Sequence, residues 1–266
     1  MKIINNTIGV KSFSETRNPF IFNPFRFAAV EITRGVFGGG TDGSDSNVMD
    51  YITIDTTGNA TDFGDLTVAR RDIAGLNSLT RGVFGGGFTP LSNVMDYITI
   101  ATTGNATDFG DLSATRQTLT GVNSLTRGVF GGGFNVSNLN IMEYITIDTT
   151  GNTTDFGDLT VARRAMGGVN SSVRGVFGGG NDSGVSNVMD YITISTTGNA
   201  TDFGDLTVAR QKLGGLNSST RGVFGGGNDG SDSNVMDYIT IDTTANATDF
   251  GDLTVARGNL AGVNGG

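Results

Sequence analysis

The sequence contains no cysteine, no histidine and no tryptophan. The absence of cysteine and histidine excludes disulfides, thiolate and imidazole metal sites, and the Ser-His-Asp and Cys-His catalytic arrangements. Only carboxylate chemistry remains to an enzyme, and Asp50, Asp62 and Asp65 recur along the chain in a repeating pattern. This recurrence indicates turn capping, or pairing with the recurring Arg34 and Arg70, rather than one unique acid–base pair. We therefore expect no enzymatic activity.

Basic residues are few: 17 Lys and Arg stand against 26 Asp and Glu, which leaves a net charge of -9. Such a charge disfavours binding to nucleic acid or to anionic lipid. The sequence has no apolar run long enough to span a bilayer, and its start, MKIINNTIGVKSFSETR, lacks the apolar stretch of a secretory signal. We expect a protein made in the cytoplasm, with neither nucleic acid nor membrane insertion among its interactions.

Glycine, by contrast, is abundant, with 43 of 266 residues, and it marks a repeat. The string RGVFGGG begins at Arg34, Arg81, Arg127, Arg174 and Arg221, in steps of 47, 46, 47 and 47 residues. Each copy continues through Met-Asp-Tyr-Ile-Thr-Ile and a Thr-Thr-Gly-Asn turn, or a close variant of either, then through Asp-Phe-Gly-Asp-Leu and an Arg, and ends on Gly-Leu-Asn or Gly-Val-Asn. A period of this size with strand-type patterning predicts a ring of small β-sheets.

Within the first copy, the pattern predicts strands over residues 35–38, 48–55, 61–66 and 73–77. Residues 57–60, with glycine and asparagine, predict a tight hairpin turn between the second and third strands. The fourth strand leads into the next copy. The sequence therefore predicts an all-β fold: a five-bladed propeller of four-stranded antiparallel blades over residues 34–266, preceded by an arm, residues 1–33.

The repeats resemble two groups of known proteins. A glycine run at 38–40, Tyr51, Phe63 and Arg70 resembles the Kelch repeat of β-propellers, with phenylalanine where Kelch blades usually have tryptophan, and five copies where six or seven are commoner. The equivalent positions are Tyr97, Phe109 and Arg116; Tyr144, Phe156 and Arg163; Tyr191, Phe203 and Arg210; and Tyr238, Phe250 and Arg257.

The run DYITIDTTGNATDFGDLTVAR after RGVFGGG also resembles repeat tracts in structural and tail proteins of tailed bacteriophages. This resemblance implies a non-enzymatic virion protein in a tail, a fibre or a head-surface appendage, which binds other virion proteins or the host surface. A cellular propeller, acting as a sugar-binding lectin or an interaction scaffold, remains the alternative.

The inner strand of the first blade can come from either end of the repeats. Residues 261–264 (AGVN) carry the signature of the other inner strands, so we predict that this segment closes the ring and removes the exposed sheet edges. Residues 27–32 compete for the same place. Within the arm lies an apolar cluster, which we expect to attach the protein to another protomer or a virion protein, or else to pack on its own propeller. It consists of Phe20, Ile21, Phe22 and Phe25.

The copies differ in two segments: the loop after the first strand and the residues after the recurring Arg70 position. In a four-stranded meander both segments emerge on one face and the uniform Thr-Thr-Gly-Asn turn on the other. Variation confined to one face indicates a recognition surface, since binding residues concentrate on loops held by a rigid scaffold; neutral drift is the alternative. The candidate binding residues are Phe88, Leu91, Phe134, Leu139, Arg71, Arg164 and Lys212.

We expect no cofactor. RGVFGGG lacks the Lys-Ser/Thr that follows in phosphate-binding loops, so it predicts close backbone packing instead. Calcium is the one alternative, because ring closure brings the loops of the first and fifth copies together and carboxylate oxygens suit this ion. The carboxylates concerned are Asp42, Asp45, Asp229 and Asp232, although neither loop has the spacing of a calcium loop.

Overall fold

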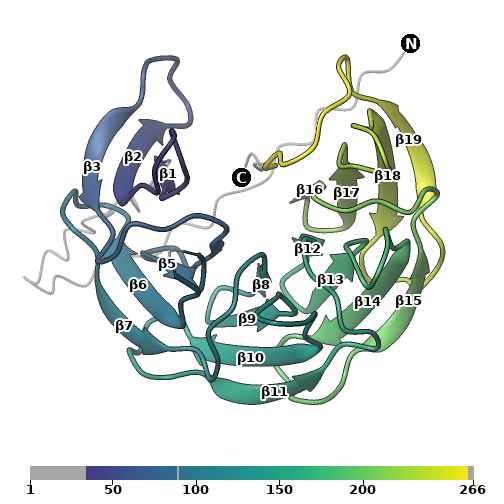
Figure 1. Cartoon of the computed structure of the whole chain (residues 1–266), viewed down its shortest axis with the longest axis horizontal. Helices are drawn as coiled ribbons and strands as arrows, with labels where there is room; N and C mark the ends of the chain where they lie inside the picture. The colour runs from purple at the N-terminus through teal and green to yellow at the C-terminus, as the bar shows by residue number, and fades with distance from the viewer. Residues whose placement is uncertain (1–33, 89, 263–266) are drawn as a thin grey trace, which may run out of the picture. The chain divides into compact units, whose positions relative to one another are not determined.

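The computed structural model describes residues 34–88 and 90–262 of the chain. These residues form nineteen strands in five antiparallel sheets, arranged as the blades of a β-propeller (Figure 1). None of them is helical, so they contain no helix able to cross a membrane. The predicted fold class is confirmed. The predicted arm and its cluster at Phe20, Ile21, Phe22 and Phe25 lie outside the described residues.

Each blade is a meander whose strands follow one another in the chain. From the first blade to the fifth, the strands are β1 (Arg34–Gly38), β2 (Val48–Thr53) and β3 (Thr61–Asp65); β4 (Ala74–Asn77), β5 (Arg81–Gly85), β6 (Val94–Thr99) and β7 (Thr107–Asp111); β8 (Thr120–Asn123), β9 (Arg127–Gly131), β10 (Ile141–Thr146) and β11 (Thr154–Asp158); β12 (Gly167–Asn170), β13 (Arg174–Gly178), β14 (Val188–Thr193) and β15 (Thr201–Asp205); β16 (Gly214–Asn217), β17 (Arg221–Gly225), β18 (Val235–Thr240) and β19 (Thr248–Asp252).

The innermost strand of a blade comes from the end of one repeat, and the other three come from the next repeat. β4 pairs with β5 in this way, with Leu76 opposite Val83. Four blades have four strands, whereas the first has three among the described residues. The segment predicted to complete it, 261–264, is described only as far as Gly262, and residues 261 and 262 form no strand. The predicted closure therefore lies largely outside the described residues.

The connection between β2 and β3 corrects the predicted hairpin. β2 ends at Thr53, and the turn follows at once, with the Thr56 N–H donating to the Thr53 carbonyl at 3.2 Å. Residues 57–60 are not this turn but a stretch without regular structure that leads to β3. The reason lies between blades, because in the second to fifth blades this stretch is hydrogen-bonded to the preceding blade, as described below.

The apolar core is divided among the interfaces between neighbouring blades, which we call seams. Phe63 on β3 packs with Met49 of its own blade and Ile98 of the next. Its ring meets Tyr51 edge to face, with centroids 6.0 Å apart. Phe109, Phe156 and Phe203 are buried in the same way. These four phenylalanines thus pack between neighbouring blades, whereas Phe250, the fifth of the series, is half exposed among the described residues.

The RGVFGGG string is a packing motif, as predicted. The Phe130 ring of the third blade fills the space beside Gly85 of the second, where a Cβ would lie 2.7 Å from it. Gly86 has a φ of 68°, and a Cβ there would lie 2.7 Å from the Arg116 carbonyl oxygen. Only glycine combines this backbone conformation with this closeness. The glycines of the motif therefore allow neighbouring blades to approach each other closely.

Candidate functional site: the variable face

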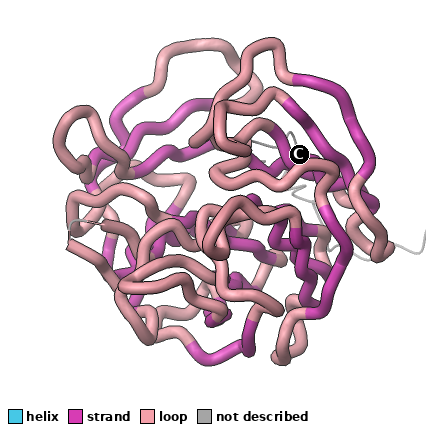
Figure 2. The backbone as a smooth tube through the Cα atoms, turned by 45° about the vertical axis from the view of Figure 1, so that its right-hand side comes forward, coloured by secondary structure: helices cyan, strands magenta, loops and turns pink. Residues whose placement is uncertain are grey.

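The two variable segments of each repeat lie side by side at one end of the blades. Isolated bridges pair Arg71 with Phe88 and Gln117 with Phe134, and the next two repeats do the same. The Phe88 N–H, for example, donates to the Arg71 carbonyl at 2.9 Å. Loops cap both ends of the strands (Figure 2), and the uniform turns occupy the other end. We call the end that carries the variable segments the variable face.

Four of the candidate binding residues form two stacked pairs. The Arg71 guanidinium lies 4.7 Å from the centre of the Phe88 ring, and that of Arg164 lies 4.3 Å from the centre of Phe134. Such cation–π contacts hold a long side chain in place. Both rings are half-buried, as are Leu91 and Leu139. These apolar loop residues are therefore not fully exposed, because an arginine covers one face of each ring.

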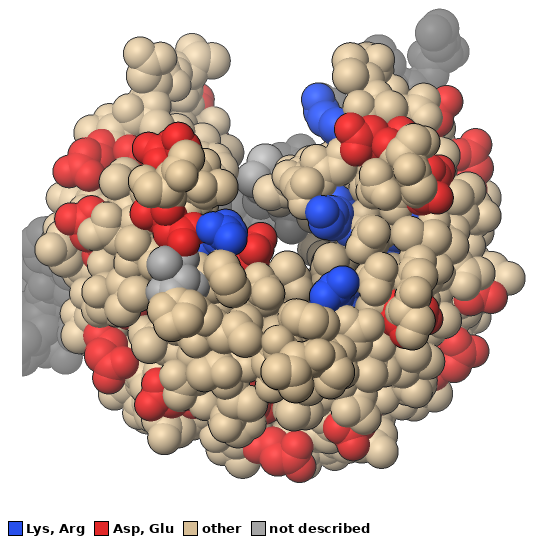
Figure 3. All heavy atoms as spheres, viewed as in Figure 1, with Lys and Arg blue, Asp and Glu red and all other residues tan. Residues whose placement is uncertain are grey.

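The cations of this face differ in their partners. Arg71 also forms an ion pair with Asp45 at 2.6 Å and lies 3.7 Å from Asp72. Arg164 and Lys212 form no ion pair with any described residue. Figure 3 shows lysine and arginine side chains gathered toward the centre of the face, and most acidic side chains toward its rim. An acidic protein thus presents a locally cationic centre.

Five residues surround the propeller axis on this face, and we call them the axial ring. All have left-handed backbone, with φ between 53° and 58°. They are Asp72, Thr118, Ala165, Lys212 and Asn259. From the second member on, each N–H donates to the carbonyl of the member before it, at 2.8 to 3.0 Å. Left-handed backbone costs a non-glycine residue on the order of 1 kcal/mol and clusters at functional sites.

The axial ring surrounds a shallow cavity of about 250 Å³. Each of its five members is followed in the chain by an apolar residue that also lines the cavity, namely Ile73, Leu119, Met166, Leu213 and Leu260. The five ring side chains all differ, although the residues that pack the blades together are nearly the same in every repeat. Sequence reasoning chose Lys212 but missed the ring as a unit. The sequence did contain a signal for the axial ring, because this one position holds a different residue type in every repeat.

A buried arginine anchors the variable face at each of four seams. Arg70, which precedes Arg71, donates to Asp96 at 2.7 Å, and to the carbonyls of Val94 at 2.7 Å and Phe84 at 3.2 Å, all in the next blade. Burial lowers the pKa of its guanidinium below the usual value, and the charge of Asp96 opposes that shift. The same arrangement pairs Arg116 with Glu143, Arg163 with Asp190 and Arg210 with Asp237.

These pairs explain one recurring carboxylate, and they confirm the predicted pairing for the Arg70 series. The Arg34 series is different. Arg34 lies over the Tyr51 ring, 4.2 Å from its centre, and donates to the Ile100 carbonyl of the next blade at 3.0 Å. The predicted pairing of Arg34 with aspartate is therefore wrong. An aromatic ring and a backbone oxygen take the place of the carboxylate.

The calcium alternative gains no support. Within 34–88 and 90–262, no three acidic side chains form a group that could hold a metal ion. Asp45 is bound to Arg71 instead. Asp42 and Asp229 each accept hydrogen bonds from a serine two residues further on.

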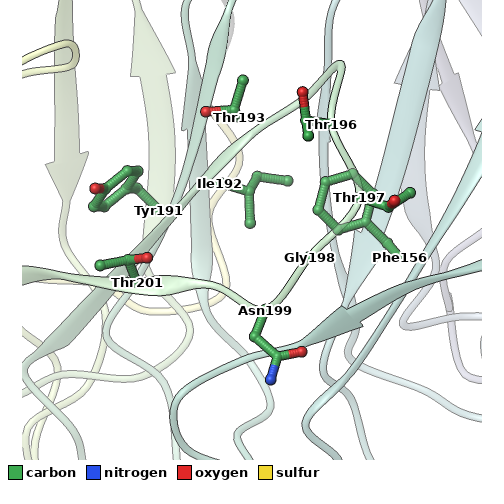
Figure 4. A pocket seen from close by; sticks show the side chains of 9 residues that line it. All are labelled: Phe156, Tyr191, Ile192, Thr193, Thr196, Thr197, Gly198, Asn199 and Thr201. Atoms are coloured by element: carbon green, nitrogen blue, oxygen red, sulfur yellow. The ribbon is translucent and has the colours of Figure 1, made fainter.

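The opposite face is built from the uniform turns, and in the second to fifth blades each turn binds the preceding blade. The Gly104 N–H donates to the Phe63 carbonyl at 2.7 Å, and the Asn105 Oδ1 accepts from the Asp65 N–H at 3.1 Å. At the seam between the third and fourth blades, a pocket of about 310 Å³ lies beside the turn (Figure 4). Tyr191, several threonines and Asn199 line it. An equivalent pocket of about 190 Å³ lies at the next seam.

No protein-family model matches this chain, and no curated protein matches it closely enough to serve as a relative. The fold is established by the structure alone. It is a five-bladed β-propeller, a rigid scaffold whose loops suggest a role in binding other proteins.

Proposed function

We propose that this protein is a non-enzymatic binding propeller that holds another macromolecule on its variable face. The observation that carries the proposal is the contrast within each repeat. Residues that pack the seams are nearly identical from copy to copy, whereas the axial ring holds five different side chains on strained backbone. Symmetric packing with an asymmetric centre is the arrangement that a selective binding surface requires.

The charges of the face define what it binds. Arg164 is held rigid by Phe134, and the exposed Lys212 lies on the axial ring next to Ala165. Neither has an acidic partner among the described residues. The ligand therefore carries an acidic group, a carboxylate of a surface glycan or of a protein side chain, and an apolar part that meets the residues inside the axial ring.

The setting that we propose is the virion of a tailed bacteriophage, as a tail, fibre or head-surface component made in the host cytoplasm. Two features of the sequence support it: the resemblance of the repeats to phage structural proteins, and the apolar cluster of the arm, which would join the propeller to other virion proteins. The variable face would then meet the host surface or a neighbouring subunit.

The test of the binding face uses charge-matched variants. Arg164→Gln with Lys212→Gln lowers the net charge by two, and so does Thr150→Glu with Thr197→Glu on exposed turns of the opposite face. The fluorescent full chain is applied to an array of acidic and neutral glycans and to host cells. We expect the first variant to lose binding at least tenfold and the second to bind as the wild type. An equal loss of binding in both variants would show that the variable face is not the binding surface.

Immunogold labelling of purified phage particles tests the proposed virion location.

A lectin with one sugar site per seam is the second candidate, favoured by the two equivalent hydroxyl-lined pockets of the opposite face. Titration with neutral monosaccharides distinguishes it. Several sugars bound per chain, with binding lost in a Thr193→Val and Asn199→Ala variant, would support the lectin against the variable-face proposal.

A further inference from the structure

The buried carboxylate differs at one of the seams. Between the second and third blades, which are neighbours in Figure 1, it belongs to Glu143 on β10, a residue that is 2% exposed. At three other seams an aspartate that is 0% exposed takes its place, namely Asp96, Asp190 and Asp237. We call these three the aspartate seams and the one at Glu143 the glutamate seam. Because glutamate is one methylene longer, its carboxylate needs different surroundings.

In the aspartate seams, a threonine of the preceding blade binds the carboxylate together with the arginine. The Thr67 hydroxyl donates to Asp96 Oδ1 at 2.5 Å, while Arg70 donates to Oδ2 at 2.7 Å. Both oxygens of the aspartate are therefore bound from the preceding blade. The equivalent threonine pairs are Thr160 with Asp190 and Thr207 with Asp237.

The glutamate seam binds its carboxylate through other donors. Ser113 stands in the place of Thr67, and its backbone N–H donates to Glu143 Oε1 at 2.9 Å. The Thr153 hydroxyl, from the third blade itself, donates to the same oxygen at 3.0 Å. Arg116 binds the other oxygen at 2.5 Å. Two donors thus take over from one threonine hydroxyl, and one of them comes from the blade that carries the glutamate.

The three residues that change come from two repeats and meet at one seam. Ser113 belongs to the second repeat, and Glu143 and Thr153 belong to the third. None of these residue types stands at the equivalent position of any other repeat, where the residues are threonine, aspartate and alanine. In the aspartate seams the alanines pack against the apolar core; they are Ala106, Ala200 and Ala247.

The two kinds of seam do not fit each other. A glutamate in an aspartate seam would add a methylene where the oxygens of Asp96 are already bound and Ala106 packs on the core, and overpacking a buried site is destabilising. An aspartate in place of Glu143 would be one methylene too short to reach Ser113 and Thr153 while it binds the arginine. Buried polar groups would then be left without partners, which is also destabilising.

Nearly identical repeats raise a problem of pairing. The aspartate seams use the same residues, so they do not distinguish one neighbouring blade from another, within the chain or from a second copy. Misassembly between similar units is a characteristic failure of repeat proteins. A seam that penalises the wrong neighbour supplies the missing specificity.

We propose that Ser113, Glu143 and Thr153 form one coupled unit that makes the second blade accept only the third as its neighbour, and that this seam fixes the register in which the blades assemble. One distinct seam is enough for this purpose. Once the second and third blades are paired correctly, the order of the chain decides which blade lies next to each of them.

Exchanging one kind of seam for the other tests the coupling. Glu143→Asp changes the carboxylate alone. A second variant changes its surroundings alone, with Ser113→Thr, Ala114→Val, Thr115→Ala and Thr153→Ala. Each should lower the melting temperature of the full chain by about 5 °C, and all five changes together, which rebuild an aspartate seam, should regain at least half of the summed loss. Losses that simply add would overturn the proposal.

The reverse exchange, at the seam between the third and fourth blades, is the matched control. Asp190→Glu alone should also be destabilising, and the surroundings of the glutamate seam should rescue it, namely Thr160→Ser, Val161→Ala, Ala162→Thr and Ala200→Thr. No rescue would contradict the coupling. A chain with both exchanges has the composition of the wild type, but its glutamate seam lies one blade further on.

Refolding tests the register. A blade paired with the wrong neighbour leaves apolar seam surface exposed, and such chains associate. The chain in which all five changes leave only aspartate seams should therefore give at least twofold less monomer on refolding from urea, measured by size-exclusion chromatography. The chain whose glutamate seam has been moved should refold as the wild type does. Equal yields from all three chains would overturn the proposal, and so would an equally poor yield from the two variants.

Discussion

At the seam between the third and fourth blades, Arg163 is buried against Asp190, and an equivalent ion pair recurs at three other seams. On the variable face, by contrast, the five residues around the axis are all different. Each seam must bury the apolar side chains and the ion pair between two blades, and the repeats do so with nearly the same residues. The residues of the variable face do not have to pack against a neighbouring blade in this way. The left-handed backbone of this face costs free energy in every repeat, which the uniform seams offset.

The largest expected effect breaks a buried pair. Asp190→Asn leaves the Arg163 guanidinium buried without its counter-ion, and burial already disfavours the charged form of this arginine. We expect a loss of about 3 to 5 kcal/mol in the free energy of unfolding, measured by urea denaturation. Asp155→Asn, at an exposed position of the preceding repeat, should change it by less than about 0.5 kcal/mol. Similar free energies of unfolding for the two variants would show that the ion pair between Arg163 and Asp190 does not stabilise the seam.

The next effect removes an aromatic side chain from a seam. Phe109→Ala leaves a cavity beside Tyr97 and the apolar residues of the third blade, and should cost about 3 to 4 kcal/mol. Thermal unfolding followed by circular dichroism measures it. An unchanged melting temperature would mean that Phe109 does not hold two blades together.

A smaller effect concerns the turns of the opposite face. Asn152→Ala removes the acceptor of the Asp111 N–H, at 3.0 Å, and should cost about 1 kcal/mol. Thr150→Ala, two residues away and exposed, is the control and should be neutral. Amide hydrogen exchange at Asp111 should speed up in the first variant alone; equal exchange in both would contradict the interblade role of the turn.

The smallest effect belongs to the axial ring. Ala165→Gly relieves a backbone at φ 54°, while glycine loses more entropy on folding, so the net change in stability should stay within about 0.5 kcal/mol of zero. The same substitution at Ala74, which is buried in the inner strand β4, should cost about 1 kcal/mol or more. A large loss from Ala165→Gly would show that the axial ring serves packing rather than binding.

The sequence by itself determined the fold class. The spacing of RGVFGGG, the strand alternation around Tyr51 and the glycine turns are local or periodic features, and a period of about 47 residues leaves little choice but stacked sheets. It also placed both variable segments at one end of the blades, because a meander reverses at every strand.

Only the tertiary structure decided which residues meet across a seam. The sequence left both turn capping and arginine pairing open for the Asp50 series, and only the structure shows that Asp96, on β6, meets Arg70, 26 positions earlier, from the preceding blade. Asn105 reads as a turn residue, but its side chain accepts the backbone N–H of Asp65, 40 positions earlier. Thr118, Ala165 and Lys212 have left-handed backbone although their residue types do not favour it, and each donates its N–H to the carbonyl of the ring member from the preceding repeat. Each of these features depends on how closely two blades approach, a distance that no pattern within a single repeat contains.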